Sequence, residues 1–515
     1  FPLTIGTVAG ISAANTITIK PAPGNSSVTI TGSNSTGIFN LNGATYITID
    51  GASSGTNQNL TINNDNTSGP VINFSGASAN NTVKNCLITG TNSSTSSGLV
   101  YFYTTATGNN NVINNCAFKK GSTAPALGVY VGGSFTGAQT IQGCDIGGMA
   151  SYGIYTSNSS SNGVLIQQNK IHDFGSYGLY LSSGNGIVAD RCEFYSNSAS
   201  SSSLYGVYLS NTPNVVVKKC KIHDLVGSSS ASLTGIYMIL ASSTPINFLV
   251  VNNEIYLETG VATTTGTVKG IDYFGYVANV GDIDYNSVYI GGSSTTGGTS
   301  YAFHKRDSAL SLTVKDNIFM NARSNSTGTG KHYAVGFTNI TTTTLALNRN
   351  DYFVSGTGGV LGLWSSTDEA TLAAWQGASS QDANSISASP SFSYGSNFLR
   401  PYNSSPLFGA GSPVTGVTDD ILDGTRSLTT PAIGAYETGV AGGLLVAPTN
   451  VEVKLDGANT EIQWDAVPYA TGYKVYWGTN PYGTTWTLLA SPTTNDYIDT
   501  NHTPGFRFYK VTATQ

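Results

Sequence analysis

One six-residue pattern recurs along most of the chain and constrains its fold more than any other feature. An apolar residue is followed by two further residues, a Cys or Asn, one more residue and a second apolar residue, as in residues 83–88 (VKNCLI). The Cys or Asn positions are Cys86, Cys116, Cys144, Asn169, Cys192, Cys220, Asn253, Asn286, Asn317 and Asn350. Successive positions are 23 to 33 residues apart. A repeat of this length predicts a solenoid, in which like strands of successive turns stack on one another.

A second strand pattern, Gly followed by an apolar residue and Tyr, recurs in phase with the first between residues 128 and 237. The tyrosines of this pattern are Tyr130, Tyr155, Tyr180, Tyr208 and Tyr237. Stacked parallel strands lie about 4.8 Å apart, so these rings are expected to form a row with one ring per turn. If the row faces outward, it forms a flat platform on which sugar rings or another protein can stack. The alternative is that the row only stabilises the sheet.

Charged residues make up only 10% of the chain, and Gly, Ser, Thr and Asn take their place. This composition favours short strands and turns over helices. The net charge of -6 gives no basic field for a phosphate backbone, so nucleic acid is not an expected partner. No apolar run approaches the roughly 20 residues of a membrane span, and no transmembrane segment is predicted.

All five cysteines lie in the repeated Cys/Asn column. Their odd number argues against a complete disulfide framework, and side chains stacked on parallel strands meet disulfide geometry poorly. We therefore predict buried free thiols that act as small apolar side chains. The asparagines of the same column are expected to form a hydrogen-bonded ladder along the axis of the solenoid.

Several segments resemble right-handed parallel β-helix proteins of the pectate-lyase-like superfamily, in the secreted or surface forms common among Bacteroidetes. These segments are residues 46–51 (YITIDG), 81–90 (NTVKNCLITG), 371–376 (TLAAWQ) with 381–384 (QDAN), and 431–437 (PAIGAYE). The resemblance covers about residues 1–440 and implies an all-β fold with a parallel β-helix over residues 1–385. It also implies a closing or capping segment and linker over residues 386–445. The same coil serves lyases, hydrolases and adhesins, so the resemblance does not define an activity.

The last part of the chain changes to strict apolar alternation in residues 451–453, 462–464, 473–476 and 508–513, with a lone buried-type Trp464. Residues 446–515 resemble a fibronectin type III module, a small immunoglobulin-like β-sandwich, which ends about where its last strand should begin. In Bacteroidetes such modules often precede a sorting domain for type IX secretion, and nothing in this sequence matches one. We expect the chain to be part of a longer protein.

The tyrosine row changes character after Tyr237, where Asp272 and His304 take the corresponding positions. A polysaccharide lyase needs a basic residue that abstracts a proton, and Asp272, His304 and Arg306 are the candidates here. Asp419, Asp420 and Asp423 are candidates for binding calcium, the one cofactor that the sequence leaves open; the alternative is a capped turn. No pair of carboxyl groups can be assigned to glycosidase chemistry.

Two His-Asp dipeptides, His172-Asp173 and His223-Asp224, recur at equivalent positions of successive repeats. A histidine beside a carboxylate is suited to acid-base catalysis. In a strand, however, neighbouring side chains point to opposite faces, so we expect the two members of each dipeptide to be separated.

Three features favour a secreted or cell-surface structural or adhesion protein. They are the low charge, the regular rows of outward side chains, and the order of a solenoid followed by a small module. In this interpretation a rigid stalk binds an extracellular glycan or a surface protein, and self-association remains open. The alternatives are a polysaccharide lyase or glycoside hydrolase acting on the β-helix face, and a non-catalytic carbohydrate-binding protein.

Overall fold

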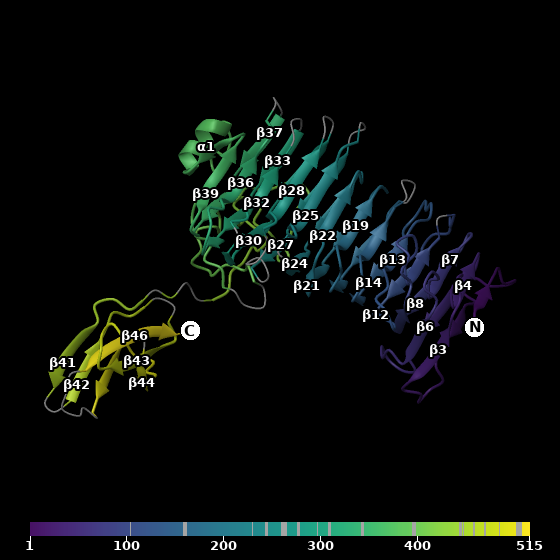
Figure 1. Ribbon diagram of the computed structural model, residues 1–515, viewed down its shortest axis with the longest axis horizontal. Helices are drawn as coiled ribbons and strands as arrows, with labels where there is room; N and C mark the ends of the chain where they lie inside the picture. Colours follow the sequence, from purple (N-terminus) through teal and green to yellow (C-terminus); the bar gives the residue numbers. More distant parts are fainter. Residues whose placement is uncertain are drawn as a thin grey trace. The chain divides into compact units, whose positions relative to one another are not determined.

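In a computed structural model, the chain folds into two compact units (Figure 1). Unit 1 contains residues 1–388 and 409–437, and unit 2 contains residues 389–408 and 438–515. The structure describes all residues except 104, 158–161, 229, 243–245, 259–264, 276–278, 296, 307–310, 341–343, 394–397, 442–444, 446, 457–458, 468–469, 484, 501–506 and 515. Within the described residues, no helix is both long enough and apolar enough to cross a membrane.

Unit 1 is a parallel β-helix built from three long sheets, and each turn of the coil contributes one strand to each sheet. Sheet A consists of β1 (Leu3–Ile5), β4 (Phe39–Asn42), β7 (Ile72–Ser75), β10 (Val100–Phe102), β13 (Leu127–Val131), β16 (Tyr152–Thr156), β19 (Tyr177–Ser182), β22 (Leu204–Ser210), β25 (Leu233–Leu240), β28 (Val268–Gly275), β32 (Ser300–Lys305), β36 (His332–Phe337), β39 (Gly359–Trp364) and β40 (Thr367–Glu369). All neighbouring strands of sheet A are parallel except β39 and β40, which pair antiparallel at the end of the sheet.

Sheets B and C are parallel throughout and contain 12 strands each. Sheet B consists of β2 (Ile17–Ile19), β5 (Ile47–Asp50), β8 (Thr82–Lys84), β11 (Val112–Asn114), β14 (Thr140–Gln142), β17 (Leu165–Gln167), β20 (Val188–Asp190), β23 (Val215–Lys218), β26 (Asn247–Val251), β29 (Val280–Asp284), β33 (Ser311–Lys315) and β37 (Thr344–Asn348). Sheet C consists of β3 (Val28–Gly32), β6 (Leu60–Asn64), β9 (Cys86–Gly90), β12 (Ala117–Lys120), β15 (Asp145–Gly147), β18 (Lys170–His172), β21 (Glu193–Ser200), β24 (Lys221–Gly227), β27 (Glu254–Leu257), β30 (Ser287–Ile290), β34 (Ile318–Asn321) and β38 (Asp351–Val354). Two short strands, β31 (Ser293–Ser294) and β35 (Ser324–Asn325), form a separate parallel pair.

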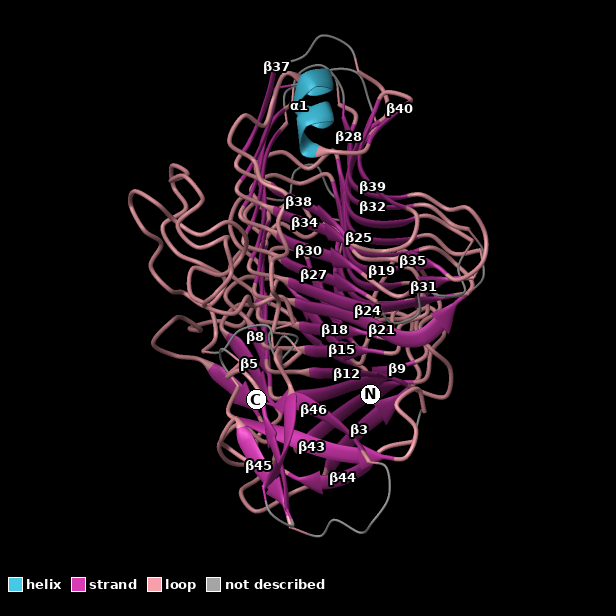
Figure 2. Cartoon of the chain, turned by 90° about the vertical axis from the view of Figure 1, so that its left-hand side faces the viewer, coloured by secondary structure: helices cyan, strands magenta, loops and turns pink. Residues whose placement is uncertain are grey.

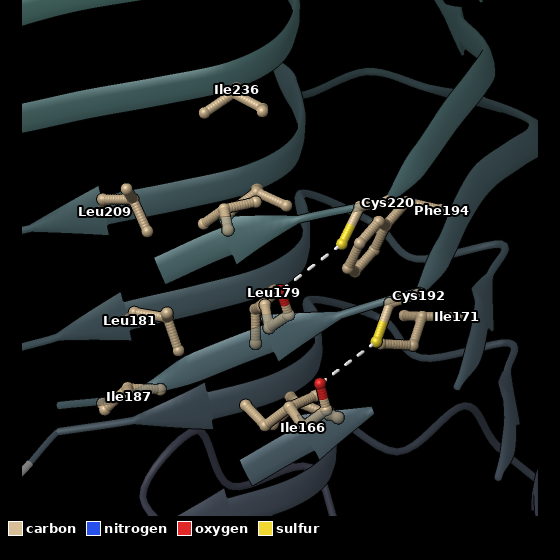
Figure 3. Close-up of a cluster of buried hydrophobic side chains, with 14 of the residues drawn as sticks. Ile166, Ile171, Leu179, Leu181, Ile187, Cys192, Phe194, Leu209, Cys220 and Ile236 are labelled. Atoms are coloured by element: carbon tan, nitrogen blue, oxygen red, sulfur yellow. Dashed lines mark hydrogen bonds between the residues drawn. The ribbon is translucent and has the colours of Figure 1, made fainter. Parts of the chain in front are cut away.

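The predicted column of cysteines lies inside the coil, where all five thiols are free and buried, as expected. Figure 3 shows Cys192 and Cys220 one turn apart, among the aliphatic side chains of the core. The Cys192 Sγ atom lies 3.5 Å from the backbone oxygen of Ile166, one turn earlier. Burial raises the pKa of the Cys116 and Cys144 thiols well above their usual value, so these groups stay neutral.

The predicted asparagine ladder is also present. The side-chain nitrogen of Asn253 donates to Oδ1 of Asn286 at 2.9 Å, and Asn286 donates in the same way to Asn317 at 2.9 Å. Asn317 continues the ladder to Asn350 at 3.0 Å. These side chains are fully buried, and their amides satisfy backbone groups at the bend between sheets B and C.

Among the residues that the structure describes there is one helix, α1 (Leu372–Ser379), at the end of the stack that carries β37, β39 and β40 (Figure 2). Its N-cap, Thr371, accepts a hydrogen bond from the Ala374 backbone nitrogen at 3.2 Å. Trp375 is fully buried against the last core side chains, and its indole nitrogen donates to Asp382 at 2.8 Å. The helix therefore covers the apolar end of the core.

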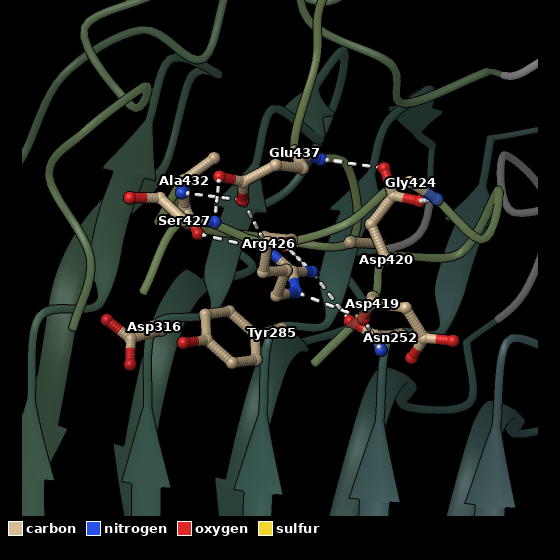
Figure 4. A network of polar contacts seen from close by, with 12 residues as sticks. Asn252, Tyr285, Asp316, Asp419, Asp420, Gly424, Arg426, Ser427, Ala432 and Glu437 are labelled. Atoms are coloured by element: carbon tan, nitrogen blue, oxygen red, sulfur yellow. Dashed lines mark hydrogen bonds and ion pairs between the residues drawn. The ribbon is translucent and has the colours of Figure 1, made fainter. Parts of the chain in front are cut away.

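Residues 409–437, which we call the strap, lie along the outside of the coil (Figure 4). Near its start the strap contacts Arg349, whose guanidinium donates to the backbone oxygen of Ala410 at 3.0 Å. Further along, Asp419 pairs with Lys219 at 2.6 Å. The strap thus runs back over the turns between sheets B and C, across several repeats.

Unit 2 contains two antiparallel sheets of three strands each. One sheet has the order β41 (Glu452–Asp456), β42 (Asn459–Gln463) and β45 (Asp496–Asp499). The other has the order β44 (Thr487–Ala490), β43 (Gly472–Gly478) and β46 (Phe508–Thr514). Both sheets contribute to one core around Trp464, which packs edge-on against Tyr473 with ring centroids 5.1 Å apart. This arrangement matches a small β-sandwich.

Candidate binding surface on sheet A

A column of glycines allows sheet A to carry two outward tyrosines on one strand. In β16 the sequence is Tyr-Gly-Ile-Tyr, and a Cβ atom on Gly153 would lie 2.3 Å from the side chain of Ile171 and 2.6 Å from the backbone oxygen of Gly178. Gly153 and Ile154 therefore both face the core, whereas Tyr152 and Tyr155 both face outward. The same constraint applies at Gly128, Gly178, Gly206, Gly235 and Gly270.

The outward tyrosines form two adjoining rows, which we call the tyrosine wall. The first row contains Tyr101, Tyr130, Tyr155, Tyr180, Tyr208 and Tyr237, and the second contains Tyr152, Tyr177 and Tyr205. Neighbouring rings of the first row have centroids 4.7 to 5.2 Å apart, and Tyr177 lies 5.0 Å from Tyr152 and 5.2 Å from Tyr205. The structure therefore brings all five tyrosines predicted from the sequence into one continuous surface.

The wall is uncharged. Most of its rings are half-buried by their neighbours, and Tyr101 and Tyr130 at its start are 7% exposed. Burial raises the pKa of Tyr155 and of Tyr177 to about 12, and the hydroxyl groups of neighbouring tyrosines contribute a smaller part of this shift. These hydroxyl groups therefore keep their protons at neutral pH and can both donate and accept hydrogen bonds.

The wall ends in a charged cluster around Asp272 in β28. The carboxylate of Asp272 accepts from Lys269 at 2.7 Å, from His304 Nδ1 at 3.0 Å and from Arg306 Nε at 3.1 Å. Arg306 also donates to the hydroxyl group of Tyr237, the last tyrosine of the first row, at 2.6 Å. The three residues predicted as catalytic candidates therefore do meet, and Lys269 and Tyr237 complete the cluster.

Burial and charge act in opposite directions within this cluster. Burial raises the pKa of Asp272, but the hydrogen bond from His304 and the charges of Lys269 and Arg306 outweigh it, so the pKa is lowered overall. Burial lowers the pKa of Lys269 and of His304, and Asp272 only partly offsets this effect. His304 is therefore neutral at pH 7, with its Nδ1 proton directed at Asp272. The cluster carries one net positive charge, from Lys269 and Arg306 against Asp272.

The sequence pattern did not indicate the second tyrosine row or Lys269. These residues share one sequence position, directly before a glycine of the column: Tyr152, Tyr177 and Tyr205 precede the glycines of three successive repeats, and Lys269 precedes Gly270. Strict alternation would place each of them on the inside, because the residue two positions later faces the core. The glycine column breaks this alternation, because sheet C packs too closely against it for a side chain.

The three aspartates of the strap are engaged in protein contacts. Asp419 and Asp423 both pair with Lys219, each at 2.6 Å, and Asp423 also pairs with Arg191. Asp420 accepts from the backbone nitrogens of Leu422, Gly424 and Glu437, at 2.8, 2.7 and 2.9 Å. Within the described part of the chain, no three His, Cys, Asp or Glu side chains are arranged to hold a metal ion.

The expectation that each His-Asp dipeptide is split between two faces is wrong. His172 contacts its neighbour Asp173 at 2.9 Å and Asp145 of the preceding turn at 3.0 Å. Asp173 has a φ angle of 51°, so the chain leaves the strand at this residue and its side chain turns back toward the histidine. His223 lies in the same way between Asp224 and Glu193, at 2.8 and 3.1 Å. These contacts are salt bridges on the outside of sheet C, away from the tyrosine wall.

Residues 107–373 match the family model of the right-handed β-helix region. This match spans more than half of the chain, and the chain belongs to the right-handed β-helix family. No curated protein sequence matches it.

Solved structures with a similar course of the chain include two enzymes and an adhesin. The A-module of a mannuronan C-5 epimerase from Azotobacter vinelandii is 12% identical, with a TM-score of 0.40 over 73% of this chain and 92% of that chain. A pectate lyase is 13% identical, with a TM-score of 0.34 over 82% of this chain and 88% of that chain. A surface adhesin of Streptococcus pneumoniae is 9% identical, with a TM-score of 0.29 over 70% of this chain and 74% of that chain. At these identities the likeness concerns the fold alone.

Proposed function

We propose that this protein is a secreted or cell-surface adhesion protein, a rigid β-helical stalk that binds an extracellular glycan along the tyrosine wall of sheet A. The observation that carries the proposal is the double row of stacked tyrosines, which continues into the cluster around Asp272 on the same face. The resemblance to secreted β-helix proteins of Bacteroidetes supports the extracellular location.

Physical chemistry favours a glycan as the ligand of this wall. The tyrosines stack on one another, which stabilises the sheet and leaves the outer edges of the partly buried rings and their hydroxyl groups at the surface. The apolar C–H groups of a sugar can pack against these ring edges, and its hydroxyl groups can pair with the neutral tyrosine hydroxyls. The proposed binding needs no bound cofactor, so dialysis against EDTA should leave the affinity unchanged.

A glycan panel with a wall variant tests the proposal. The panel contains plant, algal and microbial polysaccharides, and binding is measured for the wild-type protein and for the double variant Tyr177→Ser/Tyr180→Ser. The variant should bind at least about tenfold more weakly, because the lost contacts contribute about 1 kcal/mol per ring. Tyr195→Ser is the matched control, since this ring stacks between His172 and His223 on sheet C. Equal binding by wild type and wall variant would refute the proposal.

A second candidate function, cleavage of a polysaccharide at the Asp272 cluster, is favoured by the lowered pKa of Lys269. A lysine with a lowered pKa is neutral more often and can act as a general base. Incubation with the same panel should then release products with unsaturated or reducing ends, and Lys269→Met should abolish them. Release of such products by the wild-type protein would favour this candidate over pure adhesion.

We further propose that the chain is organised into three parts. They are a β-helix over residues 1–385, a closing segment and linker over residues 386–445, and a fibronectin type III module over residues 446–515. The strand order β41-β42-β45 and β44-β43-β46 supports the module, because such domains pack two antiparallel sheets around a buried tryptophan. Isolated expression of residues 438–515, followed by measurement of cooperative unfolding, tests this division.

A further inference from the structure

We propose that a separate site for one neutral sugar ring lies at the N-terminal end of sheet A, in a hollow beside the first ring of the tyrosine wall. This inference rests on the proposed function, because the hollow would accept one end of the glycan that lies along the wall. It names a ligand class, an uncharged saccharide, for a hollow that shares only Tyr101 with the tyrosine wall.

The hollow is lined by residues of β4, β7 and β10 and of the segments beside them. Figure 1 labels β4 and β7 near the N-terminus. It has a volume of about 410 Å³, which is within the range of sites for small ligands. Its lining residues are Ser35, Thr36, Asn40, Ser68, Pro70, Asn73, Ser75, Ser97, Tyr101 and Tyr103. All of these side chains are uncharged, in contrast to the Asp272 cluster at the other end of the wall.

Two tyrosines form the aromatic side of the hollow. Tyr103 is 41% exposed, and its ring meets Tyr101 edge-on with centroids 5.2 Å apart. Tyr101 in turn stacks on Tyr130, the next ring of the wall, at 5.2 Å. An exposed tyrosine ring at the side of a polar hollow provides a stacking surface for a sugar ring. The hollow and the wall are therefore continuous through Tyr101.

The polar side of the hollow contains an unused hydrogen-bond donor, the side-chain nitrogen of Asn40. Asn73 donates from Nδ2 to Oδ1 of Asn40 at 3.2 Å, and Ser75 donates to the same oxygen at 3.1 Å. Asn73 is 8% exposed, and its Oδ1 atom accepts no hydrogen bond. Among the described residues, none accepts a hydrogen bond from Nδ2 of Asn40.

A sugar hydroxyl group that enters the hollow can accept a hydrogen bond from the unpaired nitrogen of Asn40. A carboxylate or phosphate group could accept from the same nitrogen, but it would meet no cationic side chain among the lining residues. Removing a charge from water without a partner of opposite charge costs free energy. The hollow therefore favours a neutral ring over an acidic one.

The test uses the full chain and two sets of oligosaccharides, one neutral (cello-, manno- and xylo-oligosaccharides) and one acidic (oligogalacturonates). Isothermal titration is carried out on wild type, Tyr103→Ala and Asn40→Ala. Each variant should bind the neutral oligosaccharide about tenfold more weakly than wild type, by the loss of one ring contact or one hydrogen bond. Tyr482→Ala is the matched control, because Tyr482 is 94% exposed and lies in unit 2.

The outcomes separate this inference from the proposed function. If Tyr177→Ser/Tyr180→Ser weakens binding but Tyr103→Ala and Asn40→Ala do not, the hollow is not a sugar site, although the wall is. If wild type binds only acidic oligosaccharides, the neutral ligand class is wrong. If no saccharide binds wild type, both proposals fail. Thermal unfolding of each variant shows whether it is folded, and a crystal structure with the neutral ligand should place its ring against Tyr103.

Discussion

A Cβ atom on Gly153 would lie 2.3 Å from Cγ2 of Ile171, closer than any two such atoms can approach. Gly153 belongs to sheet A and Ile171 to sheet C, so this contact sets how closely the two sheets approach inside the coil. The absence of a side chain on Gly153 lets Ile154 face the core beside it while Tyr152 and Tyr155 both face outward. Packing in the interior thus determines the binding surface outside.

Gly153→Ala should destabilise unit 1 by about 1–3 kcal/mol, because the added methyl group overpacks a closed interior. Urea unfolding followed by circular dichroism measures this loss. Gly377→Ala is the matched control: Gly377 lies within α1, and a Cβ atom there meets nothing within 4 Å. This control should be stabilised by up to about 1 kcal/mol, since alanine favours helix. Equal effects at the two glycines would contradict the packing argument.

Substitution of an asparagine in the ladder should destabilise the protein far more than substitution of an asparagine on the surface. Asn286 is fully buried; it donates to the backbone oxygen of Val250 and accepts from the backbone nitrogen of Asn253. Asn286→Leu leaves these groups unpaired, at a cost of about 1–3 kcal/mol for each. In contrast, Asn247→Leu removes one exposed side-chain contact and should change stability by less than about 0.5 kcal/mol. Similar melting temperatures for both variants would show that the ladder is not needed.

The sequence was sufficient to predict features that depend on the repeat, because stacked turns place equivalent residues over one another. The solenoid, the buried thiols, the asparagine ladder and the row from Tyr130 to Tyr237 follow from this rule. Strand alternation by itself would place Glu254 on the outer face of sheet C, in contact with solvent. In the structure Glu254 is buried and accepts a hydrogen bond from the hydroxyl group of Tyr436, 182 residues later in the chain. No local pattern reveals where the strap binds.

His223 should make the stability of unit 1 dependent on pH. Burial lowers its pKa, but the hydrogen bonds to Asp224 and Glu193 outweigh this effect and raise the pKa from 6.5 to about 9. Because the folded-state pKa lies above the unfolded-state value, the stabilisation is complete below about pH 6.5 and is lost as the pH rises to about 9. The full effect is at most about 3 kcal/mol.

Melting temperatures measured from about pH 6 to about pH 9.5 check this prediction. His223→Gln should melt lower than wild type at the acidic end and at nearly the same temperature at the alkaline end. His332 serves as the control, because burial lowers its folded-state pKa to about 4 and it stays neutral in the folded protein throughout this range. Above about pH 7.5, where the unfolded-state histidine is also neutral, the difference between His332→Gln and wild type should not vary with pH. Closer to about pH 6 the wild type should lose stability relative to this variant, the opposite direction to His223. A constant difference for His223→Gln across the whole range would rule out a charged His223.

Arg426 should hold the strap on the coil. Its guanidinium group is buried and donates to Glu437 at 3.1 Å, to Asn252 at 2.6 Å and to the backbone oxygen of Gly434 at 2.9 Å. It also lies 3.8 Å above the centre of the Tyr285 ring. Arg426→Met removes the positive charge and leaves the carboxylate of Glu437, whose side chain is 11% exposed, without its cation. Breaking a largely buried pair in this way costs up to about 3–5 kcal/mol.

The expected result is release of the strap before the coil itself unfolds, because Asn252 and Tyr285 belong to the turns of the coil, which keep their own sheet pairing. Limited proteolysis followed by mass spectrometry should then find the first cuts of Arg426→Met within residues 409–437. Arg400→Met is the control, since Thr438 is the one described residue to which Arg400 donates, in an exposed contact of unit 2. First cuts at the same sites in Arg426→Met and wild type would mean that the strap is held by its other contacts, such as those of Lys219 with Asp419 and Asp423.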